Sequence, residues 1–329
     1  MSATTDIEWT RGDDGTPGAT WNVVTGCDEV STGCDLCFAR TFAERWRGTP
    51  GHYFENGFDV MLRPKRLTLP LGWRKPRRIF VNSMSDLFHK DVPDEFIAQA
   101  FAVMAATPRH TFQILTKRHG RMRTLLSSGR FAALVQTAVE HLAHLPGTWQ
   151  LPAADYDSAL ELVFTERADE PMRPLPNVHL GVSVEDQKAA DLRIPALLET
   201  PAAVQWISAE PLLGPVDLRR WTAMDLVCGC GQAPDGAPGA FGCSAECMQP
   251  ERSALSWVVV GGESGHGARP MDERWARDLV AQCQAAGTPA FVKQMGSVWA
   301  KGHGLRGKGG DPETWAEDLR VRQMPAGAL

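Results

Sequence analysis

Residues 78–116, RIFVNSMSDLFHKDVPDEFIAQAFAVMAATPRHTFQILT, contain two short apolar runs on either side of a helical pattern. The runs are residues 78–84 and 111–116, and both are rich in residues that favour strands. Pro93 begins the predicted helix, and Pro108 ends it before the second run. Its apolar stripe is formed by Phe96, Ile97, Ala100, Phe101 and Met104. A strand, a helix and a second strand in this order indicate a parallel sheet built from βα units.

The same rhythm continues along the chain. Further strands are predicted at residues 178–184, 204–209, 257–261 and 289–295, and another just before Cys27. A second clear helix is predicted after Asp272, which can cap it, and Gly287 with Pro289 closes it. Its apolar stripe consists of Trp275, Leu279 and Cys283. We therefore interpret Cys283 as a packed residue rather than a metal ligand.

Two stretches interrupt the rhythm. Residues 146–177 contain five prolines and follow a long helix predicted near residues 120–144. Residues 228–252 are rich in glycine, proline and cysteine. We find no internal repeat. The sequence predicts one α/β domain over residues 1–329, a partial or full β/α barrel of the TIM type, with insertions at about 146–177 and 228–252.

Composition narrows the function classes. The chain has 329 residues, of which 43% are hydrophobic, and shows neither a membrane-spanning run nor a signal-peptide pattern, so we expect a cytoplasmic protein without a membrane partner. A net charge of −5 argues against a surface that binds nucleic acid throughout. Residues 63–78 nevertheless carry seven basic residues and no acidic one, which suits either a solvated face or a phosphate-binding patch.

Polar residues gather where the predicted strands end. In parallel β/α barrels, side chains from this rim converge on a ligand. The rim residues are Asn82, Ser83, Asp86, Thr116, Lys117, Arg118, Ser183, Glu185, Glu210, Glu263, Ser264, Lys293 and Gln294.

Three cysteines lie in one short loop after the first predicted strand. Cys27, Cys34 and Cys37 have the spacing C-x6-C-x2-C, and a glycine precedes each of the first two. Thiolates are the usual ligands of iron–sulfur clusters, and a 4Fe-4S cluster held by three cysteines keeps one iron open. A structural zinc normally takes four ligands and would need a distant fourth one. Reduced structural thiols are the third alternative. The position at the barrel rim favours the cluster.

Several motifs in one order carry a resemblance to a known family. They are IEWT from residue 7, WNVVTGC from 21, GCDLCFA from 33, NSMSDLFH from 82, LTKR from 115, GVSVE from 181, AEPLLGPVDL from 209 and VVVGGESG from 258. Together they resemble the phage-type three-Cys-motif proteins of phages and bacteria, a group similar to radical S-adenosylmethionine enzymes. Val23 replaces a proline and Phe38 a tyrosine of that pattern. The first cysteine gap is three residues longer than the C-x3-C-x2-C spacing of the radical enzymes.

The resemblance implies a partial or full β/α barrel and a cluster whose open iron chelates S-adenosylmethionine. Cleavage of that cofactor would release a 5'-deoxyadenosyl radical that abstracts hydrogen from a substrate. Ser83 and Asp86 are then candidates for the methionine amino group, and Ser183 and Glu185 for the ribose hydroxyls. Gly261 and Gly262 would let the backbone approach the cofactor. The substrate side is assigned to Glu210, Glu263 and Lys293, with Lys117 and Arg118 able to pair with a phosphate or carboxylate.

A second cysteine set lies in the later insertion. Its members are Cys228, Cys230, Cys243 and Cys247, in a segment with few apolar residues to fold around. Four thiolates close a tetrahedral zinc site, which is the favoured interpretation. A second iron–sulfur cluster and free thiols in a loop are the alternatives.

The leading functional hypothesis is a radical S-adenosylmethionine enzyme that acts on a nucleic acid or nucleotide and receives electrons from an external donor. The basic residues 63–78 and the Gly-, Lys- and Arg-rich residues 301–310 suggest this substrate class. A non-catalytic, metal-stabilised nucleic-acid-binding module and a redox-sensing or electron-transfer iron–sulfur protein are the alternatives.

Overall fold

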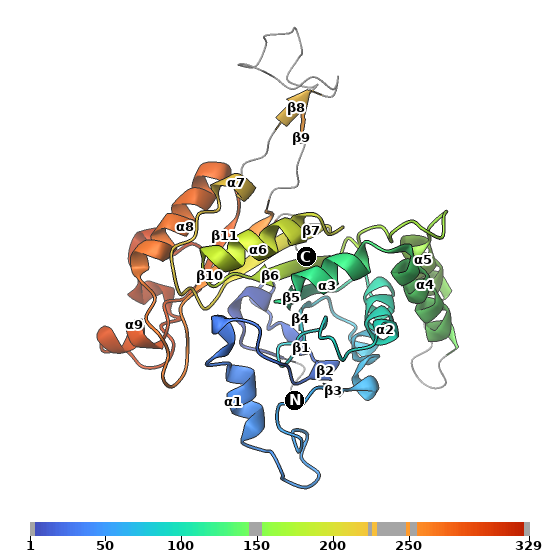
Figure 1. Ribbon diagram of the computed structural model, residues 1–329, viewed down its shortest axis with the longest axis horizontal. Coiled ribbons are helices and arrows are strands. Elements are labelled where there is room, and N and C mark those ends of the chain that lie inside the picture. The colour runs from blue at the N-terminus through green and yellow to red at the C-terminus, as the bar shows by residue number, and fades with distance from the viewer. Residues whose placement is uncertain (1–3, 145–152, 223–225, 229–247, 251–254, 326–329) are drawn as a thin grey trace.

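A seven-stranded parallel sheet dominates the computed structural model, which describes residues 4–144, 153–222, 226–228, 248–250 and 255–325 (Figure 1). Every neighbouring pair of strands is parallel, and six of the predicted strands are confirmed in this sheet. The seventh was predicted to end just before Cys27, but the first strand of the sheet ends earlier, at Trp21, and the strand next to Cys27 pairs antiparallel outside this sheet. In spatial order the strands are β1 (Ala19–Trp21), β4 (Arg78–Val81), β5 (Thr111–Thr116), β6 (Val178–Ser183), β7 (Val204–Ala209), β10 (Trp257–Gly261) and β11 (Ala290–Gln294).

The sheet curls into a half-barrel, so the partial barrel is confirmed and the full barrel is not. Within the described ranges, β1 and β11 form the two edges and do not pair with each other. Instead, Phe291 of β11 forms an isolated antiparallel bridge with Arg322 near the C-terminal end of the chain. Closure into a complete barrel would require these two edges to meet through further strand pairing.

Helices cover the convex face of the sheet. Residues that alternate outward from the strands, such as Ile79, Ile114 and Val182, are fully buried beneath them. The longer helices are α2 (Asp94–Ala105), α3 (His119–Leu126), α4 (Gly129–Ala143), α5 (Ala153–Val163), α6 (Gln187–Leu198) and α8 (Glu273–Ala286). The shorter ones are α1 (Phe38–Glu44), α7 (Arg219–Thr222) and α9 (Ser297–Gly302).

An aromatic cluster fills the concave face near the amino-terminal ends of the strands. Trp9, from the 3-10 helix Glu8–Thr10, lies with its ring centroid 5.4 Å from that of Trp206 and 6.1 Å from that of Trp257. Gly181 makes room for this packing, because a Cβ there would come within 2.4 Å of the Trp206 ring. Aromatic side chains therefore fill the concave face of the half-barrel at this end.

The two clearest helix predictions are confirmed. Helix α2 starts directly after Pro93, and Asp272 caps α8 by accepting a hydrogen bond from the backbone N–H of Arg274 at 2.9 Å. Gly287, with φ of 68°, ends α8 in the left-handed conformation that favours glycine. Cys283 is fully buried on the core side of α8, as expected for a packed thiol.

Two predictions about the middle of the chain need correction. The single long helix near residues 120–144 is two helices, α3 and α4, because Ser128 leaves the helical conformation and its hydroxyl caps α4 at the N–H of Phe131. Residues 146–177 are not wholly irregular, since α5 lies among them and buries Ala159 and Val163 in the core.

Two small antiparallel pairs complete the described strands. They are β2 (Val24–Thr25) with β3 (Met61–Leu62), and β8 (Leu226–Cys228) with β9 (Met248–Pro250). Among the described residues, no helix is both long and apolar enough to cross a membrane.

Candidate functional site

The loop that carries the three cysteines begins at the edge of the half-barrel and folds over its carboxyl-terminal rim. Cys27 follows β2, and its N–H donates to Phe58 O at 3.2 Å. Cys34 ends a 3-10 helix (Thr32–Cys34), and Cys37 directly precedes α1. Gly26 has φ of 85°, and a Cβ there would lie 2.0 Å from Asp59 O, so this bend requires glycine. Local backbone geometry thus presents all three cysteines from one short segment.

The three thiols of the loop are free and do not form a compact set of ligand atoms. All three thiols are free and partly exposed. Among the described residues, these three sulfur atoms do not all lie within 4.8 Å of one another. A single tetrahedral zinc, with Zn–S bonds of about 2.3 Å, would bring the sulfurs to roughly 3.8 Å from each other. The three sulfurs as they stand are therefore not drawn together around one such ion.

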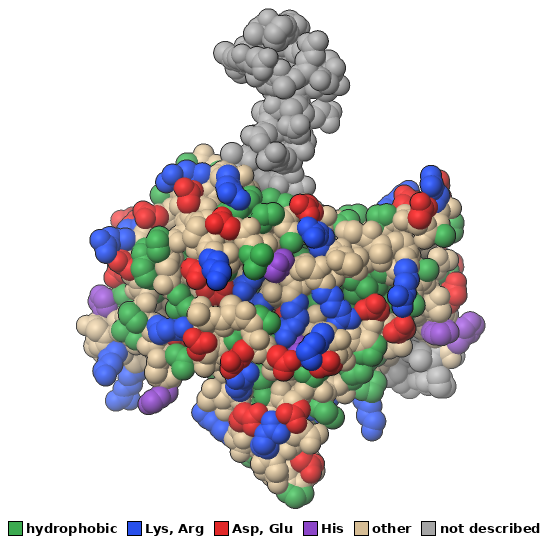
Figure 2. All heavy atoms as spheres, in the orientation of Figure 1, with side chains coloured by type: hydrophobic (Ala, Val, Ile, Leu, Met, Phe, Trp, Pro, Cys, Tyr) green, Lys and Arg blue, Asp and Glu red, His purple; other side chains and the backbone are tan. Residues whose placement is uncertain are grey.

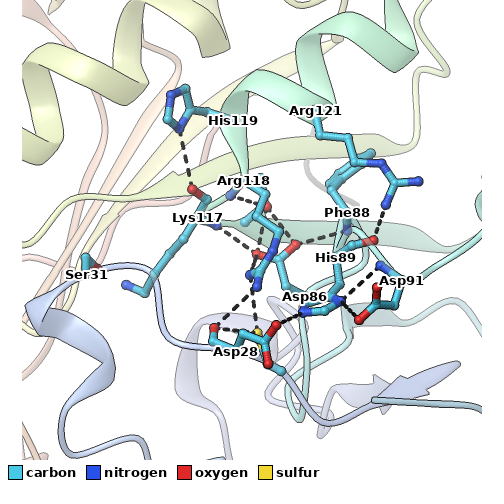
Figure 3. A network of polar contacts seen from close by, with 12 residues as sticks. Asp28, Ser31, Asp86, Phe88, His89, Asp91, Lys117, Arg118, His119 and Arg121 are labelled. Carbon is cyan, nitrogen blue, oxygen red and sulfur yellow. Dashed lines mark hydrogen bonds and ion pairs between the residues drawn. The ribbon is translucent and has the colours of Figure 1, made fainter. Parts of the chain in front are cut away.

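Charged side chains, among them Asp28, Asp86 and Arg118, gather at the start of the cysteine loop (Figure 3). Arg118, just after β5, donates from Nη1 to Cys27 Sγ at 3.3 Å and from Nη2 to Asp28 O at 3.3 Å. Burial and the nearby Asp86 carboxylate raise the pKa of Cys27 to about 11, and Arg118 opposes that shift. Arg118 is therefore the group that favours the thiolate form of Cys27.

Asp86, predicted to hold an amino group, is occupied by donors of the protein itself. Its carboxylate accepts from the hydroxyl of Thr116 at 2.7 Å, from the backbone N–H groups of Phe88 and Lys117 at 3.0 Å each, and from Arg118 at 3.4 Å. It is only 4% exposed. Asp86 thus ties the end of β4 to the end of β5 and orients Arg118. The nearby Ser83 is less constrained, since its hydroxyl contacts Asn22 at 3.3 Å.

Glu185, predicted to hold ribose hydroxyls, instead holds the cysteine loop. The Ser31 hydroxyl donates to its Oε1 at 2.8 Å, Arg193 donates to its Oε2 at 2.8 Å, and Lys117 forms an ion pair with it. Burial alone would raise the pKa of Glu185, but these partners outweigh burial and lower it. Gly33 packs directly on the carboxylate, because a Cβ there would lie 2.4 Å from Oε1. Ser183 lies nearby, and its backbone oxygen accepts from Arg193 at 2.7 Å.

A second clamp on the loop starts from Glu263. Arg269 donates to both oxygens of this carboxylate, with Nη2 2.6 Å from Oε1 and Nε 2.9 Å from Oε2. The same guanidinium reaches Thr32 O at 2.9 Å and Asp35 at 3.1 Å. Burial would raise the pKa of Glu263, but its bonds to Arg269 lower it. Glu263 therefore acts through Arg269 on the segment between Cys27 and Cys37.

Glu210 and Lys293 form an ion pair at the rim. In the part of the chain that the structure describes, neither side chain has a hydrogen bond or ion pair with the cysteine loop. Lys293 Nζ lies 3.0 Å from Glu210 Oε1, and the Ser208 hydroxyl donates to Oε2 at 3.2 Å. Both side chains remain partly exposed, at 14% for Glu210 and 19% for Lys293. Gly261 provides the space, since a Cβ there would lie 2.5 Å from Glu210 Oε1. Gly262 is equally restricted by Met295 O, at 2.3 Å.

The side chains of Asp28, His89 and Asp91 lie close together, with one potential metal-ligand atom of each within 4.8 Å of the others. His89 is fully buried, its Nε2 lies 3.1 Å from Asp28, and its Nδ1 accepts the N–H of Asp91 at 3.2 Å (Figure 3). Lys90 Nζ approaches both carboxylates, at 3.6 and 3.0 Å. In the structure, His89 and Lys90 therefore hold the Asp28 carboxylate in place at the start of the cysteine loop.

Sequence reasoning missed the residues that connect the rim to the loop, namely Ser31, His89, Arg193 and Arg269. NSMSDLFH does include His89, so a local signal existed for that residue. The second cysteine set is outside what the structure describes: Cys228 ends β8 without a described side chain, and Cys230, Cys243 and Cys247 fall in residues 229–247.

Part of the basic segment at residues 63–78 is structural. Arg63 donates to Tyr53 O at 2.7 Å, and the buried Arg78 pairs with Asp13 at 2.8 Å. A cleft of about 550 Å³ lies at the amino-terminal ends of the strands, away from the cysteines, and is lined by Lys75, Arg77, Arg78, Asp13 and Asp14 among others. Figure 2 shows basic and acidic side chains interspersed over the visible face, without a large field of one sign.

Comparison with known proteins gives a family but no described activity. No curated protein and no solved structure matches the chain. A family model matches residues 4–322, which include the cysteine loop, every strand of the half-barrel and all the rim residues described above. The chain therefore belongs to the family described as "Protein of unknown function (DUF5131)".

Proposed function

We propose that the protein is an iron–sulfur enzyme of the radical S-adenosylmethionine type that acts on a nucleic acid or nucleotide. One observation carries the proposal: three free thiols on one loop are clamped over the carboxyl-terminal rim of a parallel half-barrel by side chains from several strand ends. The motif order that resembles the phage-type three-Cys-motif proteins supports it. The rim is where parallel β/α folds place their reaction centres.

In this proposal Cys27, Cys34 and Cys37 hold a 4Fe-4S cluster. When bound, such a cluster supplies one electron to S-adenosylmethionine, whose cleavage starts the hydrogen abstraction. The side chains of the rim hold the cysteine loop in position. Ser31 joins it to Glu185, and Arg269 joins it to Glu263. These contacts lie at the ends of β6 and β10, so the loop is held from two strands.

The remaining rim residues divide into three groups. Ser83, Ser183, Gly261 and Gly262 are proposed to contact S-adenosylmethionine. Asp86, Glu185, Glu263 and Lys117 are held by protein partners and are assigned to positioning. Glu210 and Lys293, paired at 3.0 Å and partly exposed, are the best placed to meet a polar group of the substrate. As an acceptor and a donor side by side, they suit a group such as a base edge or a hydroxyl.

The test is anaerobic reconstitution followed by reduction with dithionite in the presence of S-adenosylmethionine. The wild-type protein should contain about four irons at the loop and yield 5'-deoxyadenosine. Cys34→Ala should lose the iron and the brown colour. Cys283→Ala is the matched control. It also removes one thiol, but Cys283 lies outside the cysteine loop and is buried in the hydrophobic core. Iron retained by Cys34→Ala, or an intact cluster without 5'-deoxyadenosine, would contradict the proposal.

The basic cleft favours one alternative function. Lys75 and Arg77 line the cleft of about 550 Å³ at the amino-terminal ends of the strands, together with Asp13, Asp14 and the Arg78 that pairs with Asp13. A metal-stabilised module would bind nucleic acid there without chemistry, and its affinity would fall steeply with salt even in cluster-free protein. A redox-sensing or electron-transfer protein would keep the cluster and release no 5'-deoxyadenosine. Elemental analysis for zinc, at about one ion per chain, tests the proposed four-cysteine site of the insertion.

A further inference from the structure

Arg118 is the only described cation whose hydrogen bond ends on a cysteine sulfur of the loop. Its Nη1 lies 3.3 Å from Cys27 Sγ, while Nη2 donates to Asp28 O at 3.3 Å. Asp86 accepts from the same nitrogen, with Oδ2 3.4 Å from Nη1. The Arg118 side chain is only 13% exposed. It is thus fixed in place beside one of the three thiols, with little water to screen its charge.

Arg269 provides an internal comparison. It also reaches the loop, but its partners there are the backbone oxygen of Thr32 and the carboxylate of Asp35. Both arginines can hold the loop in position. Among the described contacts, Arg118 alone adds a charge-assisted hydrogen bond to a ligand sulfur, so their effects on the electronic properties of a bound cluster should differ.

We infer that Arg118 is a positioning residue that raises the reduction potential of the cluster through its bond to Cys27 Sγ. This inference rests on the proposed function, because it requires a cluster on Cys27, Cys34 and Cys37. Hydrogen bonds to the sulfurs and the local net charge are among the factors that set such potentials. The reduced cluster carries one more negative charge than the oxidised one. A fixed cation therefore stabilises the reduced form more and makes one-electron reduction easier.

Asp86 limits the size of the effect. Its carboxylate faces the same guanidinium and adds negative charge near Cys27. We therefore expect loss of the Arg118 charge to change the one-electron equilibrium by about tenfold, which corresponds to about 59 mV. The direction is toward a more negative midpoint potential.

The experiment compares reconstituted wild-type protein with Arg118→Met, Arg118→Lys and Arg269→Met. Iron content is measured first, and the midpoint potential is then determined by a dithionite redox titration followed by electron paramagnetic resonance of the reduced cluster. Arg118→Met should have a midpoint about 59 mV lower. Arg118→Lys, which keeps the charge, should lie closer to wild type. Arg269→Met should keep the wild-type potential, even if it retains less iron.

A wild-type potential in Arg118→Met, or an equal fall in Arg269→Met, would overturn the inference, because loop position alone would then explain the data. If Arg118→Met retains no iron, Arg118→Gln takes its place and must show the same fall. Failure of the proposed function is distinguishable. A cluster that cleaves no S-adenosylmethionine refutes the enzyme but still allows the Arg118 comparison, whereas wild-type protein without iron overturns both.

Discussion

Glu185→Gln should destabilise the protein and loosen the cysteine loop at the same time. Glu185 is 1% exposed and bonds Arg193, whose side chain is 5% exposed, at 2.8 Å. Removing one partner of a buried ion pair leaves the other charge unpaired and typically costs about 3–5 kcal/mol. Lys117 is 17% exposed and can turn toward water, so its share of the loss is smaller. Glutamine keeps one acceptor oxygen, which places the expected loss near the lower limit, about 3 kcal/mol.

The assay is urea unfolding of the metal-free protein, combined with the rate at which a thiol reagent modifies the loop. Loss of the Ser31 bond should speed modification of Cys34 and Cys37. The matched control is Glu199→Gln, which breaks a surface pair between Arg123 and Glu199 with side chains 45% and 61% exposed. Such surface pairs contribute about 0–1 kcal/mol. If Glu185→Gln lowers stability no more than this control does, the assignment of Glu185 as the loop anchor is wrong.

Three further predictions concern the bend, the pH dependence and the substrate side. Gly26→Ala should prevent stable iron binding, because φ of 85° and a Cβ only 2.0 Å from Asp59 O force the loop to shift; normal iron content in a folded variant would contradict this. The pKa values of Glu185 and Glu263 are lowered in the fold, so the stability they contribute is complete above their unfolded pKa of about 4.5 and is lost as pH falls through the lower folded values. The urea midpoint should therefore decline below about pH 4.5, and a rise there would refute this reasoning. Lys293→Met should keep the iron and the reductive cleavage of S-adenosylmethionine but lower turnover of the substrate by about 10- to 100-fold, as for loss of a hydrogen bond from a charged donor; unchanged turnover would exclude Lys293 from the substrate side.

Local sequence signals were sufficient for most of the fold. The strand–helix–strand pattern of residues 78–116 predicted β4, α2 and β5 because apolar periodicity and proline punctuation act within a few residues. Ser128 was missed as a cap, since serine within a helical pattern has no distinctive period of its own. Closure of the barrel was left open for a different reason. It depends on whether β1 and β11 meet, and these strands are separated by most of the chain.

The sequence predicted which residues lie at the candidate site, but not which of them form hydrogen bonds or ion pairs with one another. Cysteine spacing and the polar ends of strands identified the loop and the rim, because both are local patterns. Which cation meets which carboxylate depends on distant segments: Arg269 joins Glu263, six residues earlier, to Asp35, which is 234 residues away. A pattern of residue spacing within one segment cannot predict a contact between residues so far apart in the sequence. For the same reason the sequence assigned Asp86 and Glu185 to a ligand, whereas their lone pairs are largely taken by protein donors.

These pairings also explain how a chain of net charge −5 can place several cations beneath its cysteine loop. The buried or partly buried rim carboxylates Asp86, Glu185, Glu210 and Glu263 face five cations, which are Lys117, Arg118, Arg193, Arg269 and Lys293. Asp28 and Asp35 add negative charge, but both are more than half exposed and are screened by water. The layer beneath the loop therefore carries an excess of one cation. At Cys27, the direct contact with Arg118 opposes burial and the Asp86 carboxylate but does not overcome them, so the pKa of this thiol is raised to about 11 and a metal group bound there would have to displace the thiol proton.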